Sequence, residues 1–364
     1  MSWSPQQEQA LAAVKDWIKD EGNQVFRLFG YAGTGKTTLA KEIAESSEGE
    51  VMFGAFTGKA ASVMRRKGCR GARTIHSMIY KLKNQVDGKP EFELDLESDV
   101  KEADLLIIDE CSMLGEDIGK DLLSFGTKIL VLGDPAQLPP IKGTGFFTDA
   151  KPDFMLTEVH RQARDNPIIA MSMLIRERQS LQHGSYGDSR VIAKADITSG
   201  EILAADQVIV GLNRTRQLYN GRIRQLLNRQ PETPAAGDKL ICLRNDRHVG
   251  VFNGSMWTAT KIKHKKRKQL FKMHIVSADD ERDSESIVDT REEFFNGTEG
   301  TLPWQTKKGT QEFTFGYAIT CHKSQGSQWG NTVVFDESGC FRDDAARWKY
   351  TAITRAADRV TVVM

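Results

Sequence analysis

Hydrophobic and polar positions alternate in the first third of the chain, where short apolar runs are separated by segments of helical length. Four apolar runs have the length of strands: residues 25–29, 51–56, 105–108 and 129–132. Unbroken apolar runs of this length are typical of strands that are buried on both faces. Helical segments such as residues 37–46 and 58–67 lie between these runs. The alternation predicts a parallel sheet with helices on both of its faces.

The same alternation returns toward the end of the chain. A strand-like run at 207–211 precedes a helical segment at 214–228, and a second helical segment covers 343–353. Further strand-like runs cover residues 313–320, 332–335 and 359–363. We therefore expect a second α/β domain in this part of the chain.

Two inserts interrupt this pattern. Residues 81–101 are polar and acidic and contain the turn signal Gly88-Lys89-Pro90, which predicts a small hairpin. Residues 237–312 alternate short β-like runs with turns and dense charge, which predicts a small β domain. Proline and glycine residues between 231 and 237 mark a linker before this second insert.

A chain of 364 residues has the length of two or three domains. The predicted first domain covers residues 1–152 and includes the hairpin insert. The predicted second domain is built from residues 153–236 together with 313–364. The β insert at 237–312 lies between these two parts.

The first predicted strand is followed by a glycine-rich phosphate-binding motif. Residues 30–37 have the sequence GYAGTGKT, which fits GxxxxGK[ST] between a predicted strand and a predicted helix, the context of a P-loop. Backbone N–H groups of such a loop surround phosphate oxygens, and the helix N-terminus favours the anion. Lys36 would reach the β- and γ-phosphates of ATP, and Thr37 would bind Mg²⁺. The residues predicted to bind ATP in this loop are Gly30, Gly33, Thr34, Gly35, Lys36, Thr37 and Thr38.

Two acidic residues end the third apolar run. Asp109 and Glu110 follow residues 105–108, and the carboxyl end of a parallel strand faces the ligand crevice. Asp109 would hold Mg²⁺ together with Thr37, and Glu110 would polarise the attacking water. These two motifs predict a nucleoside triphosphatase, but kinases, transporters and motors share the same chemistry.

Composition excludes some classes of protein and leaves others open. Lys plus Arg total 50 and Asp plus Glu total 49, so a nucleic-acid partner would have to be bound by local basic surface. The five cysteines form no CxxC pair, so we expect reduced thiols rather than a zinc site or disulfide framework. We see no signal peptide and no apolar run of about 18 residues. We therefore expect the protein to be located inside a cell.

Further segments resemble the motifs of superfamily 1 helicases, in the family's order and over nearly the whole chain. Residues 133–140, 318–327 and 350–356 resemble motifs III, V and VI. Residues 56–61, 74–77, 156–162 and 4–7 resemble motifs Ia, Ib and IV and the adenine-binding Q motif. The sequence DECSM at 109–113 fits the RecD/Dda branch, which is superfamily 1B. The resemblance implies an α/β fold with two RecA-like P-loop domains that bind ATP between them.

The resemblance also implies roles in ATP hydrolysis for single residues. Gln137 would sense the γ-phosphate, and Arg161 and Arg355 would act as arginine fingers from the second domain. A planar guanidinium can neutralise charge on a transferring phosphoryl group, although either arginine could instead be a surface residue. Gln7 would bind the adenine edge, and its neighbour Gln6 is the alternative.

In this family single-stranded DNA crosses both domains. The residues that match DNA-facing positions are Thr57, Lys59, Thr74 and His76 in the first domain, and Thr320, His322, Lys323 and Ser324 in the second. Hydroxyl and lysine contacts to phosphates position a strand without recognising its sequence, and either histidine could instead be structural. Two basic clusters, at 65–73 and 261–268, could follow a phosphate backbone or could be solvated surface.

The two inserts carry further expectations. Residues 81–101 lie where relatives carry a hairpin that splits the duplex. Phe92 would either stack as a wedge against the last base pair or anchor the hairpin to its own domain. The insert at 237–312 resembles the SH3-like domain of this branch. The branch also implies 5′→3′ movement, a direction that no residue by itself indicates.

The predicted function is that of a helicase that uses ATP and Mg²⁺, moves 5′→3′ on single-stranded DNA and unwinds duplexes. Its predicted partners are single-stranded DNA and junctions between single strands and duplexes, with replication or recombination proteins beside it. The compact length favours a stand-alone enzyme of phage type, and we also expect a monomer. The alternatives are a translocase that does not unwind, and a RecD-like motor subunit of a nuclease complex. RNA stays open as a substrate.

Overall fold

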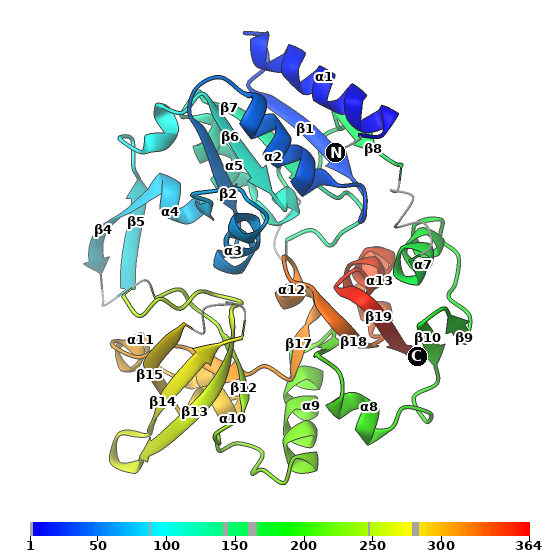
Figure 1. Ribbon diagram of the computed structural model, residues 1–364. Coiled ribbons are helices and arrows are strands. Elements are labelled where there is room, and N and C mark those ends of the chain that lie inside the picture. The colour runs from blue at the N-terminus through cyan, green and yellow to red at the C-terminus, as the bar shows by residue number, and fades with distance from the viewer. Residues whose placement is uncertain (1–2, 87–88, 141–144, 159–165, 247, 279–283) are drawn as a thin grey trace.

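The computed structural model describes residues 3–364 except 87–88, 141–144, 159–165, 247 and 279–283. The strands of these residues form two six-stranded sheets, one five-stranded sheet and one two-stranded sheet. The sheet that carries the N-terminal third lies at the top of Figure 1, and the second six-stranded sheet lies below it. None of the helices in the described part of the chain combines the length and the apolar character needed to cross a membrane.

The first sheet is parallel throughout and has the strand order β3-β2-β6-β7-β1-β8. Its strands are β1 (Val25–Gly30), β2 (Val51–Ala55), β3 (Arg73–Thr74), β6 (Leu105–Asp109), β7 (Lys128–Gly133) and β8 (Phe154–Leu156). The four strands predicted from apolar runs are thereby confirmed as β1, β2, β6 and β7. β8 was not predicted, and it extends this sheet past residue 152, where the first domain was expected to end.

Helices cover both faces of the first sheet, as the alternation predicted. They are α1 (Pro5–Lys19), α2 (Lys36–Ser46), α3 (Gly58–Arg66), α4 (Ile75–Ile79) and α5 (Glu116–Leu123), with 3₁₀ turns η1 (Asp99–Lys101) and η2 (Cys111–Met113). Along β6, Leu105 and Ile107 pack with α1, α2 and α3, while Leu106 and Ile108 pack with α4 and α5. This alternation explains why the whole strand is apolar.

The second six-stranded sheet has the order β17-β11-β18-β19-β10-β9 and is parallel except at the edge strand β9. Its strands are β9 (Gly184–Tyr186), β10 (Ser189–Ile192), β11 (Gln207–Val210), β17 (Ala318–Thr320), β18 (Trp329–Phe335) and β19 (Ala356–Val363). Its helices are α7 (Pro167–Arg176), α8 (Ser199–Leu203), α9 (Asn213–Leu226), α12 (Cys321–Ser324) and α13 (Ala345–Ile353), with the 3₁₀ turn η5 (Ser338–Asp344). The second α/β unit is therefore present as predicted.

One strand prediction in this region was wrong. The apolar run at 313–320 is two strands, because β16 (Phe313–Phe315) pairs with β12 (Lys239–Cys242) in the five-stranded sheet. β17 begins at Ala318 and pairs with β11 in the second six-stranded sheet. The chain crosses between sheets at Gly316, where an added Cβ would lie 2.7 Å from the Met256 methyl group and 3.0 Å from the backbone of Leu240.

The five-stranded sheet is antiparallel, with the order β15-β14-β13-β12-β16. Its other strands are β13 (Met256–Lys265), β14 (Leu270–Ser277) and β15 (Glu285–Arg291), and α10 (Glu293–Asn296), α11 (Trp304–Lys307), η3 (Lys266–Lys268) and η4 (Glu299–Thr301) accompany them. Its core contains Trp257, Phe271, Phe295 and Phe313. We call residues 239–315 the β insert. It lies beside the second α/β unit in Figure 1.

The first insert is a two-stranded hairpin of β4 (Tyr80–Val86) and β5 (Lys89–Leu94). Lys89 and Pro90 lie in β5 rather than in a turn, and Gly88 lies outside the described residues. The hairpin projects from the first sheet on the side where the β insert lies (Figure 1).

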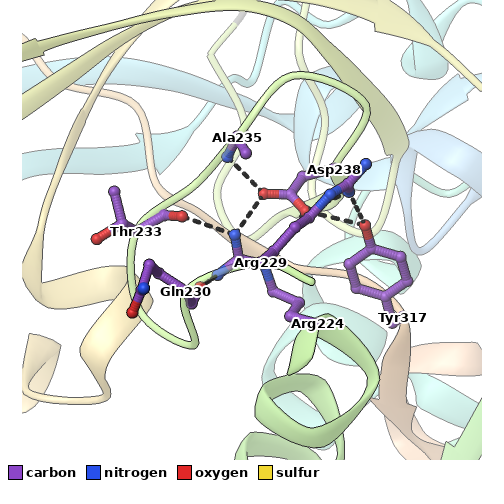
Figure 2. A network of polar contacts seen from close by, with 7 residues as sticks. All are labelled: Arg224, Arg229, Gln230, Thr233, Ala235, Asp238 and Tyr317. Atoms are coloured by element: carbon purple, nitrogen blue, oxygen red, sulfur yellow. Dashed lines mark hydrogen bonds and ion pairs between the residues drawn. The ribbon is translucent and has the colours of Figure 1, made fainter. Parts of the chain in front are cut away.

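A buried polar network fixes the β insert to the second α/β unit at both of its connections (Figure 2). Asp238, just before β12, accepts hydrogen bonds from Arg224 on α9 (3.0 Å), from Arg229 (2.7 Å) and from the Tyr317 hydroxyl (2.9 Å). The Ala235 N–H also donates to Asp238, at 2.6 Å. Burying an ion pair is costly unless its hydrogen bonds are fully made, and here both oxygens of the carboxylate are in use. The segment at 231–237, which was predicted to be a linker, is thus held in place by the hydrogen bonds of this network.

Candidate active site

The P-loop lies between the end of β1 and the start of α2, as predicted. Gly33 and Gly35 have φ of 80° and 84°, a left-handed conformation that glycine adopts without strain. The Lys36 ammonium donates to the carbonyls of Gly30 (2.6 Å) and Tyr31 (3.1 Å). A glycine-rich loop that leads into a helix N-terminus and carries one lysine is suited to bind a phosphate group.

The predicted magnesium ligands lie next to each other. The Thr37 hydroxyl donates to a carboxylate oxygen of Asp109 at 3.1 Å. Burial and the neighbouring Glu110 carboxylate raise the pKa of Asp109, while Lys36 opposes this shift. Mg²⁺ prefers oxygen ligands and usually takes only one or two from the protein, with phosphate oxygens and water completing the shell. The pair fits that requirement.

Glu110 has a strained backbone. Its φ of 56° and ψ of 45° place a residue with a side chain in the left-handed region. Such conformations cost about 1–3 kcal/mol and cluster at functional sites. The Glu110 N–H donates to Asp109 at 2.8 Å, which ties the two acids together at the end of β6. This geometry directs Glu110 away from the strand and into the cavity beside the P-loop.

The two candidate adenine-binding glutamines have different surroundings. Gln7 is buried, accepts from the Ser4 N–H (3.0 Å) and donates to the Thr34 carbonyl of the P-loop (3.1 Å). Gln6 instead accepts from the N–H groups of Thr157 and Glu158, just after β8. The Gln7 side chain therefore bonds both the capping box of α1 and the P-loop. Binding of adenine by Gln7 stays a prediction.

A cavity of about 1820 Å³ lies between the two α/β units. The first unit contributes the P-loop, Asp109, Glu110 and Gln137 to its walls, and the second contributes Thr354 and Arg355. The cavity therefore brings together the predicted catalytic residues that the structure describes. Arg161 lies outside the described residues.

Arg355 is a buried cation at the wall of this cavity. Its guanidinium donates to the Thr351 carbonyl (3.1 Å), the Ser327 carbonyl (3.3 Å) and the Thr354 hydroxyl (3.2 Å). All three acceptors are neutral, and among the described residues no carboxylate lies within ion-pair distance of Arg355. A buried positive charge without an anionic partner is suited to receive an anion.

Tyr350 links the two units across the cavity, which sequence reasoning did not foresee. Its hydroxyl accepts from the Ala32 N–H of the P-loop (2.9 Å) and donates to Asp134 (2.7 Å). Burial raises the pKa of both Asp134 and Tyr350. Arg176, at the end of α7, adds a second contact, with its guanidinium 3.4 Å from the centre of the Tyr31 ring. Both groups of the second unit thus contact the phosphate-binding loop of the first.

Motif III is also bonded to the second unit. The Leu138 N–H donates to the Thr351 hydroxyl (2.9 Å), and the Leu138 carbonyl accepts from the Gln325 amide (2.9 Å). Gln137 is buried beside these bonds, and its amide oxygen has no hydrogen-bond donor among the residues that the structure describes. An unpaired buried oxygen can accept a donor such as an attacking water, which suits a residue predicted to sense the γ-phosphate.

The predicted DNA-facing residues of the first unit have varied environments. The Thr57 hydroxyl caps α3 by accepting from the Ala60 N–H at 3.1 Å. Lys59 is buried in the wall of the large cavity, 4.8 Å from the ring centre of Trp329. Thr74 is largely buried at the start of α4, and the exposed His76 ring packs on Tyr80. Partial desolvation by the neighbouring side chains lowers the pKa of His76, which favours its neutral form.

In the second unit, Thr320 and Ser324 are buried, and the Ser324 hydroxyl donates to the Cys321 carbonyl of its own helix at 2.7 Å. This environment argues against a DNA contact for Ser324. His322 is half-buried with its ring near Phe341, and burial lowers its pKa. Lys323 is the better-placed cation, since its ammonium reaches the β insert at Asn253.

The β insert contacts both units near these residues. An added Cβ at Gly58 would lie 2.5 Å from Phe252 of the β insert, so the first turn of α3 packs directly on this ring. The next residue, Asn253, accepts from the Lys323 ammonium at 2.8 Å. The turn at 252–253 therefore joins motif Ia of the first unit to motif V of the second.

The hairpin carries an exposed aromatic ring. Phe92 on β5 pairs with Leu82 and is 56% exposed, so more than half of the residue is open to solvent. This exposure favours the wedge over the anchor, although the wedge itself stays a prediction. In the first basic cluster, Arg73 pairs with Asp99 (3.2 Å), while Arg66 and Lys67 line the large cavity.

Two family models match the chain. One is described as an AAA domain and matches residues 2–196, and the other is described as a UvrD-like helicase C-terminal domain and matches residues 315–363. The first match covers more than half of the 364 residues and includes the P-loop and motifs III and IV. The second covers motifs V and VI.

Two relatives are named as helicases. The ATP-dependent RecD2 DNA helicase of Deinococcus radiodurans is 28% identical over 383 residues, which cover 96% of this chain and 48% of the relative. The ATP-dependent DNA helicase dda of Enterobacteria phage T4 is 31% identical over 185 residues, which cover 47% of this chain and 42% of the relative. The matches span just under half the length of each of these two proteins.

Solved structures show the same fold. Pif1 from Bacteroides bound to ssDNA has a TM-score of 0.60 at 18% identity, over 99% of this chain and 92% of that chain. The ADP-AlF3 and ssDNA complex of Pif1 from Bacteroides has a TM-score of 0.59 over the same shares. These likenesses establish the two-domain RecA-like α/β fold. The relatives make this chain similar to the RecD2 and dda helicases, in agreement with the resemblance to superfamily 1B. The match over residues 2–196 shows that the chain belongs to the AAA domain family.

Proposed function

We propose that this protein is an ATP-dependent DNA helicase that moves 5′→3′ on single-stranded DNA and unwinds duplexes. The observation that carries the proposal is the set of direct bonds from the second α/β unit to the phosphate-binding machinery of the first. Tyr350 bonds the P-loop and Asp134, and Thr351 bonds motif III. Closure of the two units is thereby coupled to the site where ATP would bind, which is what a motor requires.

The catalytic roles follow from the geometry. Lys36 and the P-loop N–H groups would hold the β- and γ-phosphates, and Thr37 with Asp109 would hold Mg²⁺. Bound Mg²⁺ would neutralise charge on the phosphate oxygens. Glu110 would orient the attacking water, and Arg355 would stabilise the charge that develops on the γ-phosphoryl group. Arg355 already lies in the cavity wall, so its guanidinium would need little rearrangement to act.

A short segment of the second unit would connect DNA binding to hydrolysis. Lys323, Gln325 and Ser327 lie within five residues of one another. Lys323 faces the β insert, Gln325 bonds motif III, and the Ser327 carbonyl accepts from Arg355. A strand bound at Lys323 would therefore act on both the γ-phosphate sensor and the arginine finger, which supports stimulation of ATP hydrolysis by DNA.

Further parts of the proposal concern the DNA. Residues Thr57, Lys59, Thr74, His76, Thr320 and His322 would line the path of the strand. Phe92 would stack on the last base pair of the duplex, and the β insert would act as the SH3-like domain of this group. We further propose that the enzyme works as a monomer in the cytoplasm of a bacterium or phage-infected host, beside replication or recombination proteins.

The ATPase rate, measured with and without single-stranded DNA, tests this function. We expect strong stimulation of the wild type by DNA. Lys36→Ala should abolish turnover, because the phosphates lose their cation. Lys41→Ala is the matched control, since Lys41 lies on the exposed face of the same helix, paired with Glu45. Turnover that DNA does not change, at salt low enough to allow binding, would contradict the proposal.

A further inference from the structure

A second, smaller cavity of about 220 Å³ lies where the β insert meets the second α/β unit. The second unit contributes Asn213 and Arg216 on α9, Ile319 on β17 and Lys323 on α12. The β insert contributes an apolar wall and one acidic residue, which are Ile241, Leu243 and Glu299. The cavity is separate from the ATP site and lies at the seam held by the Arg224–Asp238 network.

Arg216 is the unusual residue of this cavity. Its Nε atom is buried and has no acceptor among the described residues, and no carboxylate of these residues lies within ion-pair distance of its guanidinium. Burial lowers the pKa of Arg216, and only the more distant Glu299 opposes that shift. A guanidinium that has lost part of its water without gaining an anion carries an uncompensated desolvation cost.

A second cation lies in the same cavity and is also poorly compensated. The Lys323 ammonium donates to Asn253, a neutral amide, at 2.8 Å. Burial lowers the pKa of Lys323, and the neighbouring Arg216 contributes to that shift. Glu299 is the one acidic residue that lines the described cavity, and one of its carboxylate oxygens is buried without a donor. Two cations against one carboxylate leave a net positive charge in a partly desolvated site.

We propose that this cavity is a phosphate-binding site that takes one sugar–phosphate unit of the single strand, held between Arg216 and Lys323. An arginine fork matches the geometry of phosphate oxygens, and a charge-assisted hydrogen bond would offset the cost of burying Arg216. The apolar wall of Ile241, Leu243 and Ile319 suits the sugar ring next to that phosphate. The site rests on the function proposed above and adds Arg216 and the β insert to the path of the strand.

The size of the cavity selects the form of the ligand. A volume of about 220 Å³ accepts one sugar–phosphate unit but not a double helix. The site would therefore bind a single strand and exclude a blunt duplex. Lys323 lies two residues before Gln325, whose amide donates to the Leu138 carbonyl of motif III. Binding of a phosphate at Lys323 would therefore affect motif III through this hydrogen bond.

Fluorescence anisotropy with a labelled oligothymidylate, over a range of salt concentrations, tests the site in the full-length protein. Each phosphate contact on a single strand contributes about 0.7 to the slope of log affinity against log salt. Arg216→Gln should weaken binding about tenfold at about 0.1 M salt and reduce the slope by about 0.7. Glu299→Gln should strengthen binding, because it removes the one repulsive charge. Arg222→Gln is the matched control, because Arg222 is an exposed arginine nearer the C-terminal end of the same helix, α9.

The outcomes separate the site from the proposed function. If the wild type binds oligothymidylate but Arg216→Gln keeps the affinity and slope of Arg222→Gln, the cavity holds no phosphate and the helicase proposal stands. If the wild type itself shows no salt-dependent binding, the proposed function fails, and the site with it. Should Arg216→Gln not fold, Glu299→Gln alone decides: unchanged or weaker binding by this variant would overturn the site. A blunt duplex should show no difference between Arg216→Gln and the control.

Discussion

The change Tyr350→Phe tests whether closure of the two α/β units depends on the bonds described above. The substitution removes a single oxygen atom from a buried position. In the closed arrangement the Ala32 N–H then loses its acceptor at 2.9 Å and one oxygen of Asp134 loses its donor at 2.7 Å. Asp134 keeps the N–H of Ala136, so it is not left without any partner.

The size of the effect can be worked out from these two bonds. A buried polar group left without its partner costs about 1–3 kcal/mol. Water that enters the space of the lost hydroxyl recovers part of this cost, so we expect about 2 kcal/mol against closure. Since about 1.4 kcal/mol corresponds to a tenfold change in an equilibrium constant, kcat/KM for ATP should fall about 30-fold.

The assay is steady-state ATP hydrolysis at saturating single-stranded DNA, together with a thermal unfolding curve for each variant. Tyr219→Phe is the matched control, because Tyr219 is a buried tyrosine of the same unit that packs on Phe335 away from the ATP site. We expect Tyr219→Phe to keep kcat/KM close to wild type. If Tyr350→Phe also stays within about twofold of wild type while folded, the hydroxyl does not couple the units and the reasoning is refuted.

Three further predictions concern single residues. Arg355→Ala should keep nucleotide binding within a few fold but lower kcat about 10³-fold, as measured by single-turnover hydrolysis, and an unchanged kcat would remove its role as a finger. Phe92→Ala should impair unwinding more than DNA-stimulated ATPase, with the exposed Leu96→Ala as control, and equal loss of both activities would count against the wedge. The raised pKa of Asp109 means that its charged form destabilises the folded protein at neutral pH, a cost that vanishes below the unfolded pKa of about 4. Asp109→Asn should therefore raise the melting temperature of the nucleotide-free protein at pH 7.5 but not near pH 4, and a lower melting temperature at pH 7.5 would contradict the sign.

The sequence predicted the central strands of both six-stranded sheets because such strands are buried on both faces and must be apolar throughout. The prediction from hydrophobicity failed where one continuous apolar run contains strands of two different sheets. Residues 313–320 are continuous in hydrophobicity, yet the chain leaves the five-stranded sheet and enters the second six-stranded sheet within them. β8 was missed because three residues at a sheet edge carry too short a pattern.

The sequence predicted the separate motifs of the candidate site but not the contacts between residues that are distant in the chain. The P-loop and the acids at the end of β6 are contiguous motifs, so local sequence located them. Tyr350 and Asp134 are 216 residues apart in the chain, and only the fold brings the hydroxyl to the carboxylate. Arg216 and Arg176 lie in no motif and were missed for the same reason. Their roles depend on what surrounds them in space, which no local pattern encodes.

In the proposed function, ATP hydrolysis between the two units drives separation of DNA strands. The most direct measurement is strand displacement from duplexes that carry either a 5′ or a 3′ single-stranded tail, with ATP and Mg²⁺ present. We expect displacement of the strand from the 5′-tailed duplex and little from the 3′-tailed one. Absence of displacement from both substrates, by a protein whose ATPase is stimulated by single-stranded DNA, would contradict the helicase and leave a translocase that does not unwind.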